Sequence, residues 1–121
     1  MTIAEEMTRL YRQTPGCRAL VFGDVQARTV LRAVADPDLR QEDHDRLLAE
    51  AAARLGGDPA ASAFGLGPLG AVIRMEAGQT RLFLPSGDGG GEAFCARCTG
   101  APGAEDLARL EDGLRALLAD G

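Results

Sequence analysis

Six prolines divide this chain of 121 residues into short segments, so no single helix or strand can be long. They are Pro15, Pro37, Pro59, Pro68, Pro85 and Pro102. Proline lacks a backbone N–H and interrupts the interior of helices and strands, so each is expected to lie between two elements. A chain of this length fits one compact domain, and we expect residues 1–121 to form it.

Three segments carry apolar residues at helical spacing. They are Thr2–Gln13, Gln41–Leu55 and Ala104–Asp120. In the first, Thr2 followed by Glu5 fits a capping box at the helix start. The last carries a stripe of leucines. Their contribution outweighs the lower helix propensity of Gly113, which costs about 1 kcal/mol relative to alanine.

Five further segments are apolar and bounded by turn residues, as strands are. They are Arg18–Gly23, Arg28–Ala35, Gly70–Glu76, Thr80–Leu84 and Glu92–Thr99. Short turns join most of them, which implies antiparallel pairing, and apolar residues on both strand faces imply helices on both sides. The sequence predicts an α+β, sandwich-like fold: a five-stranded antiparallel sheet flanked by helices, in the order α-β-β-α-β-β-β-α. A loop is expected over Asp58–Pro68.

The charge balance argues against nucleic-acid binding. The chain has 13 positive and 18 negative side chains, a formal net charge of −5. Every positive residue is arginine, and the arginines are spread from Arg9 to Arg115, so a coding bias explains them better than a phosphate-binding patch. The acidic start is unlike a signal peptide, and no apolar run approaches the roughly 20 residues that span a bilayer. We therefore expect a cytoplasmic protein without a membrane segment.

The motif Cys95-Ala96-Arg97-Cys98 has the spacing of zinc and redox sites. Within a strand, however, residues three apart face opposite sides. A zinc site also needs about two more ligands, for which the chain offers only Cys17 and His44. Buried, unreactive thiols are the favoured interpretation, and a zinc or redox protein that uses Cys95 and Cys98 stays as an alternative.

Two other segments could suggest chemistry. The glycine-rich stretch Ser86–Gly91 joins two predicted strands rather than opening a helix, so a hairpin turn is favoured over a phosphate loop. In Asp43-His44-Asp45, adjacent helical residues point about 100° apart, which favours a solvated helix start over a converging site. No catalytic constellation results, and we expect neither an enzyme nor a bound metal or cofactor.

Two surfaces are candidates for contact with a partner. The helix Gln41–Leu55 carries a stripe that mixes leucines with small alanines, and this stripe could pack on the chain's own sheet or against a partner helix. The strand Gly70–Glu76 is strongly apolar, and at a sheet edge it would need covering or pairing. The candidate interface residues are Leu47, Leu48, Ala51, Ala52, Leu55, Ala71, Ile73 and Met75.

Three stretches, together with the order of the elements, resemble the roadblock (dynein light-chain) family. They are Pro15–Phe22, Leu69–Gly78 and the leucine-striped final helix, and the resemblance covers nearly the whole chain. It implies a sheet between helices, dimerised through the third strand and the second helix. It also implies a non-enzymatic platform, which in bacteria and archaea often binds a Ras-like GTPase.

We therefore expect a homodimeric regulatory module that binds a partner protein, with a Ras-like small GTPase as the candidate partner. The main alternative is a small-molecule sensor of PAS-like or profilin-like type, because such domains share a helix-flanked antiparallel sheet. With one Tyr, four Phe and no Trp, the chain offers few aromatic walls for a ligand pocket, which disfavours that alternative.

Overall fold

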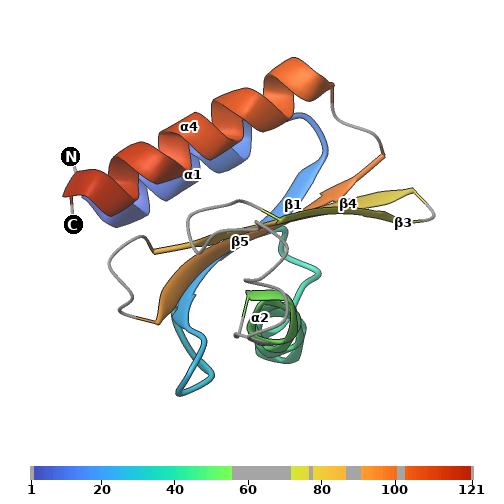
Figure 1. Ribbon diagram of the computed structural model, residues 1–121. Helices are drawn as coiled ribbons and strands as arrows, with labels where there is room; N and C mark the ends of the chain where they lie inside the picture. The colour runs from blue at the N-terminus through green and yellow to red at the C-terminus, as the bar shows by residue number, and fades with distance from the viewer. Residues whose placement is uncertain (1, 56–71, 77, 87–90, 101–102, 121) are drawn as a thin grey trace, which may run out of the picture.

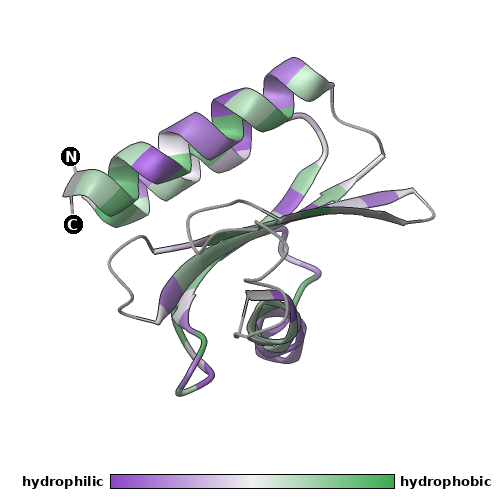
Figure 2. Cartoon of the chain, in the orientation of Figure 1, coloured by the Kyte–Doolittle hydropathy of each residue, from purple (hydrophilic) through white to green (hydrophobic). Residues whose placement is uncertain are grey.

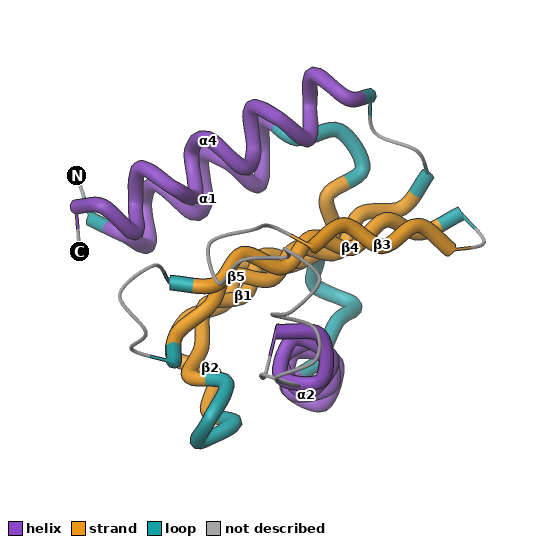
Figure 3. Tube along the Cα trace, viewed as in Figure 1, coloured by secondary structure: helices purple, strands orange, loops and turns teal. Residues whose placement is uncertain are grey.

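The fold is α+β, as predicted from the sequence, in a computed structural model that describes residues 2–55, 72–76, 78–86, 91–100 and 103–120. Figure 3 shows the elements along the chain. In order they are α1 (Ile3–Gln13), β1 (Cys17–Asp24), β2 (Thr29–Ala35), α2 (Gln41–Leu55), β3 (Val72–Glu76), β4 (Gln79–Pro85), β5 (Glu92–Thr99) and α4 (Ala104–Asp120).

The strands form one antiparallel sheet in the order β2-β1-β5-β4-β3. Helices α1 and α4 cover one face of this sheet and α2 covers the other, so the molecule has three layers (Figure 1). The prediction of helices on both faces is confirmed. The N- and C-termini lie near each other, at the same end of the α1–α4 layer.

Successive side chains of the central strands point to opposite faces of the sheet, so the apolar side chains form two cores. On the side of α1 and α4, Leu20 of β1 and Phe94 of β5 pack with leucines of both helices. On the side of α2, Val21 of β1 and Cys95 of β5 pack with Leu48. The central strands are coloured largely as hydrophobic, whereas hydrophobic and hydrophilic residues alternate along α4 (Figure 2). Because both faces are buried, the central strands contain runs of apolar residues rather than an alternating pattern.

The start of α1 confirms the predicted capping box. The hydroxyl oxygen of Thr2 accepts a hydrogen bond from the Glu5 backbone N–H at 3.1 Å, and the Glu5 carboxylate accepts one from the Thr2 N–H at 3.3 Å. These two bonds satisfy donors that the first turn of a helix otherwise leaves unpaired.

The prediction that every proline lies between elements is wrong for Pro85, the last residue of β4. Ser86 donates its N–H to the Glu92 carbonyl at 2.8 Å. In this register the nitrogen of Pro85 points away from β5, so no bond between these two strands is lost. The expected loop Asp58–Pro68, the residue Ala71 and the middle of the Ser86–Gly91 turn lie outside the described residues.

The two longest helices, α2 and α4, have the predicted bounds, and β5 does as well. The other strand ends shift by one or two residues. Strand β1 starts at Cys17 rather than Arg18, because the chain turns sharply at Gly16, whose φ is +75°. In the part of the chain that the structure describes, no helix has the length and apolar character needed to cross a membrane.

Candidate functional site

The sheet has two outer edges, β2 and β3, and they differ in regularity. Strand β3 pairs with β4 over five residues with no register shift. The pairing of β2 with β1 is interrupted by a bulge opposite Phe22 and Gly23. A bulge twists an edge strand and hinders the addition of a further strand. The β3 edge is therefore the one better suited to pair with another chain.

Among the side chains that the structure describes, each edge carries one exposed large apolar residue. Leu31 of β2 is 52% exposed and Ile73 of β3 is 47% exposed. Leu31 is the extra residue of the β2 bulge, with no partner in the β1 register. Ile73 lies opposite Leu82, which belongs to the core under α1 and α4, so Ile73 is on that same face of the sheet.

The predicted interface stripe of α2 packs mostly on the chain's own sheet. Leu47 is 5% exposed, and Leu48 and Ala51 are completely buried, all within the core that includes Val21 and Phe83. Of the two uses left open for this stripe, the structure shows packing within the protomer for these three residues. Ala52 is half-buried and keeps some surface for a partner.

Among the candidate interface residues whose side chains the structure describes, Ala52 and Ile73 keep exposed surface, and they lie on opposite faces of the sheet. Ala52 lies on α2, below the sheet, whereas Ile73 lies on the opposite face. Met75 is placed only by its backbone, opposite Thr80 in the β3–β4 register. The side chains of Leu55 and Met75 lie outside what the structure describes, as does Ala71.

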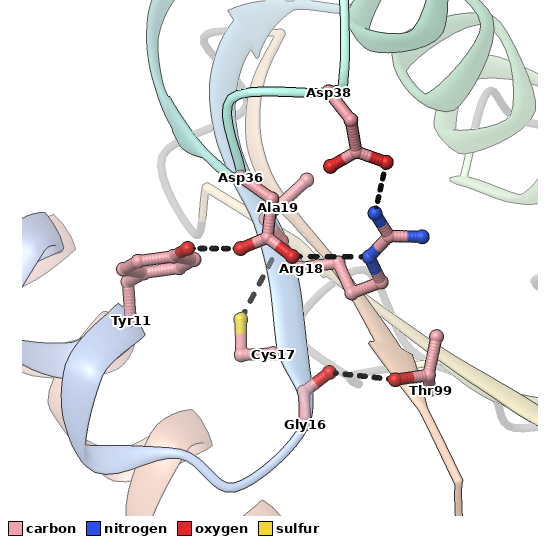
Figure 4. Close-up of polar contacts among 8 residues, drawn as sticks. All are labelled: Tyr11, Gly16, Cys17, Arg18, Ala19, Asp36, Asp38 and Thr99. Atoms are coloured by element: carbon pink, nitrogen blue, oxygen red, sulfur yellow. Dashed lines mark hydrogen bonds and ion pairs between the residues drawn. The ribbon is translucent and has the colours of Figure 1, made fainter.

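A polar cluster that sequence reasoning missed joins α1, β1 and the end of β2 (Figure 4). Arg18 is the extra residue of a bulge in β1, where Cys17 and Ala19 oppose consecutive residues of β5. Its Nε donates to Asp36 at 3.1 Å, and its guanidinium also pairs with Asp38. The Tyr11 hydroxyl donates to the other oxygen of Asp36. The acidic pair around Pro37 was the available sequence signal, but nothing local indicated that Arg18 faces it.

This cluster shifts the acidity of its members. The hydroxyl of Tyr11 and the guanidinium of Arg18 hold the pKa of Asp36 below its usual range. Arg18 likewise lowers the pKa of Asp38. Hydrogen bonds to the ionised carboxylates favour their charged form, so the cluster is a set of fixed charges rather than a proton donor. Its role is to hold α1 and the β2 end against β1.

The lowered carboxyl pKa values predict a specific acid sensitivity. A group whose pKa is lower in the folded state stabilises the fold above its unfolded pKa, about 3.9 for Asp, and that contribution is lost as pH falls through the folded value. We expect Asp36→Asn to reduce the free energy of unfolding near neutral pH. The difference from the natural chain should shrink as pH falls from about 5 toward 3. Urea unfolding of both chains across this range measures it.

Tyr11→Phe is the companion variant, because it removes only the hydroxyl donor to Asp36 and keeps the ring. This variant should reduce the acid-dependent contribution of Asp36 to the free energy of unfolding, while leaving the ion pairs of Arg18 in place. A stability difference between Asp36→Asn and the natural chain that stays constant down to pH values of about 2.5 would contradict the role given to this cluster.

Three arginines form a row across the α2 face of the sheet. Arg81 lies opposite Arg74 on one neighbouring strand and opposite Arg97 on the other. The carboxylate of Glu50, from α2, accepts from Arg81 at 2.7 Å. The Nε of Arg97 is buried, and no residue in the described part of the chain offers it a hydrogen-bond partner. The expectation that the arginines are scattered is wrong for these three, because strand register brings them side by side.

The predicted separation of Cys95 and Cys98 is confirmed, and it excludes the shared zinc or redox site. Cys95 is buried in the core beneath α2. Cys98 follows the alternation of Phe94 and Ala96, which face α1 and α4. Burial raises the pKa of the Cys95 thiol to about 12. Among the described residues, no group of three or more metal-binding side chains comes together.

Asp43, His44 and Asp45 do not converge either. The Asp43 carboxylate accepts the Arg40 backbone N–H at 2.9 Å and so closes the first turn of α2. Asp45 instead accepts from Gln41 at 2.9 Å. The expectation of a solvated helix start is wrong for the Nδ1 atom of His44, which is buried and has no hydrogen-bond partner among the described residues.

No protein-family profile matches the sequence, and no curated protein sequence does. Solved structures do match in three dimensions. A roadblock/LC7 domain from Streptomyces avermitilis superimposes with a TM-score of 0.71 and 14% identity, covering 98% of this chain and 99% of that one. The gliding protein MglB from Thermus thermophilus gives 0.72 and 12%, covering 97% and 88%. MglC from Myxococcus xanthus gives 0.67 and 9%, with complete coverage of both chains.

These structural matches extend over nearly the whole chain, and so include the sheet and the helices on both of its faces. At identities this low they establish the fold and not the partner. The resemblance drawn from the sequence is confirmed at that level, and the chain has the roadblock/LC7 fold.

Proposed function

We propose that the chain forms a homodimer that serves as a non-catalytic regulatory platform for a protein partner, a Ras-like small GTPase. The observation that supports it is the regular β3 edge, with exposed Ile73, in a roadblock/LC7 fold. The family resemblance adds the expectation of dimerisation through the third strand and second helix, and of a small GTPase as partner. Residues 1–121 would form the single domain of each copy.

The physical reason for pairing is the unsatisfied backbone of an edge strand. The sheet order ends at β3, and among the described residues no strand pairs with its outer side. Adding β3 of a second copy in antiparallel fashion would satisfy those N–H and C=O groups and continue the sheet across both copies. The small Ala52 on α2 would allow the neighbouring helix of the second copy to approach.

The seam is tested by the oligomeric state of edge variants. Light scattering at micromolar concentration should give twice the protomer mass for the natural chain. Ile73→Arg places a charge in the proposed seam and should weaken the dimer by about 30-fold or more, the equivalent of roughly 2 kcal/mol. Ala52→Arg should weaken it as well if α2 contributes to the seam.

Leu31→Arg is the matched control, since it makes the same change at the other edge, at a residue of similar exposure. We expect it to leave the dimer intact. A natural chain that is strictly monomeric would exclude the dimer. Loss of the dimer in Leu31→Arg but not in Ile73→Arg would move the seam to β2.

The partner is tested separately. Affinity capture from extract of the source cells, followed by mass spectrometry, should recover a small GTPase. Binding of that purified GTPase should differ between its GDP-bound form and its form bound to a non-hydrolysable GTP analogue. Capture that recovers other proteins, or binding insensitive to the nucleotide, would contradict the partner class while leaving the dimer result standing.

A further inference from the structure

Two cysteines that are 81 positions apart in the sequence lie directly opposite each other on neighbouring strands. Cys17, the first residue of β1, pairs with Cys98 near the end of β5. Cys17 is 8% exposed and Cys98 is 1% exposed. The third cysteine, Cys95, lies on the other face of the sheet and cannot join them.

The backbone hydrogen bonds show which kind of cross-strand pair this is. The Thr99 N–H donates to the Gly16 carbonyl oxygen at 2.9 Å, which is one of the two bonds of a hydrogen-bonded pair, while the Cys17 N–H donates to the Thr14 carbonyl oxygen at 3.1 Å rather than to β5. In an antiparallel ladder the next pair along, Cys17 with Cys98, is then of the non-hydrogen-bonded kind. Such pairs bring Cα atoms to about 4.5 Å and their side chains closer than the alternate pairs do. Disulfides form at Cα separations of about 4.4–6.8 Å, a range that includes this value.

The close approach of the two backbones is visible at the neighbouring residue. A Cβ atom added to Gly16 would lie 2.5 Å from the carbonyl oxygen of Thr99. The two thiols also influence each other. Hydrogen bonding with Cys98 raises the pKa of Cys17, and the same contact lowers the pKa of Cys98. The lower value favours the thiolate, which is the reactive form in disulfide chemistry.

We propose that Cys17 and Cys98 are a redox modification site, at which a peroxide converts the two thiols of one protomer into a reversible cross-strand disulfide. One sulfur takes an oxygen atom from hydrogen peroxide, forming a sulfenic acid and releasing water. The second thiol displaces the hydroxyl, forming the S–S bond and a second water. The two thiols lose two electrons and two protons in all, and the peroxide is reduced.

The position of the pair gives the oxidant a route. Gly16, Thr99 and Gly100, the neighbours of the pair along the chain, are exposed, and Cys17 itself keeps 8% of its surface accessible. The disulfide would join β1 and β5 at the point where the chain arrives from α1. It closes a loop that includes most of the sheet, which restricts the unfolded chain strongly. The oxidised form should therefore be markedly more resistant to unfolding.

The test uses the purified natural chain, treated with hydrogen peroxide and then denatured in the presence of a maleimide. The oxidised protein should lose the mass of two hydrogen atoms and take up maleimide at Cys95 alone. Peptide mapping should show Cys17 linked to Cys98. The Tm should rise by an amount on the order of 10 °C, and dithiothreitol should reverse both changes.

Three variants serve as controls. Cys95→Ala should keep the disulfide and the Tm shift, whereas Cys17→Ser and Cys98→Ala should lose both. A disulfide that includes Cys95, a disulfide between two copies, or oxidation to sulfinic acid without a crosslink would each overturn the proposal. The mass readout on the natural chain does not depend on whether a variant folds, nor on the dimer or its partner.

Discussion

Replacing Gly16 by alanine is expected to lower the free energy of unfolding by about 3 kcal/mol, the larger part of it from a steric overlap. Gly16 has a φ of +75°, a conformation that costs an alanine about 1 kcal/mol. Its added Cβ would lie 2.5 Å from the Thr99 carbonyl oxygen. That oxygen belongs to a backbone, so the overlap is relieved only by parting β1 from β5 at their ends. Urea unfolding followed by circular dichroism measures the loss.

Gly100→Ala is the matched control for this prediction. Gly100 has the same φ of +75°, but no atom of the described residues lies within 4 Å of the position of its added Cβ. This variant should therefore show only the conformational cost, about 1 kcal/mol. Equal losses in the two variants would mean that the contact with Thr99 has no effect and that the strands part there without resistance.

Gly113→Val is expected to destabilise the fold by about 3 kcal/mol, although valine is a better helix former than glycine. Gly113 lies in the middle of α4, where α4 crosses α1. A Cβ added there would lie 2.4 Å from one terminal carbon of Leu10 and 3.1 Å from the other. Leu10 is itself buried in the core under these helices. The side chain of Leu10 can therefore move only by displacing its neighbours in this core.

Two further variants isolate this contact. Ala116→Val introduces the same residue at an exposed position of the same helix and should cost only about 0.5 kcal/mol. Gly113→Ala should destabilise the natural chain but stabilise a Leu10→Ala background by up to about 1 kcal/mol, because the obstructing carbons are gone. The same sign in both backgrounds would show that Leu10 does not determine the choice of glycine.

Gly113 shows which features of α4 the local sequence predicts and which it does not. The sequence correctly predicts a helix over Ala104–Asp120, because the leucine spacing is strong enough to outweigh one glycine. From helix propensity alone, that glycine is expected only to destabilise the helix slightly. The reason for the glycine is the close passage of α1, a helix at the other end of the chain. No local pattern contains that information.

The candidate interface residues also combine a pattern that the sequence predicts with a placement that only the folded chain shows. The α2 periodicity correctly identifies Leu47, Leu48 and Ala51 as one apolar stripe. An apolar stripe looks the same whether it packs on its own sheet or on a second molecule, so only the tertiary structure shows that these residues are used within the protomer. Likewise, the apolar character of residues 72–76 is legible in the sequence, but the place of β3 at the regular edge is not.

Local spacing in the sequence is enough to predict the order of the described helices and strands, the capping box at Thr2 and the α+β class, because these depend on patterns within a few residues. It also predicts that Cys95 and Cys98 face opposite sides, since side chains alternate along a strand. The row of Arg74, Arg81 and Arg97 and the pairing of Cys17 with Cys98 are visible only in the folded sheet. Each depends on which strands are neighbours and in what register, and those are properties of the whole packed sheet.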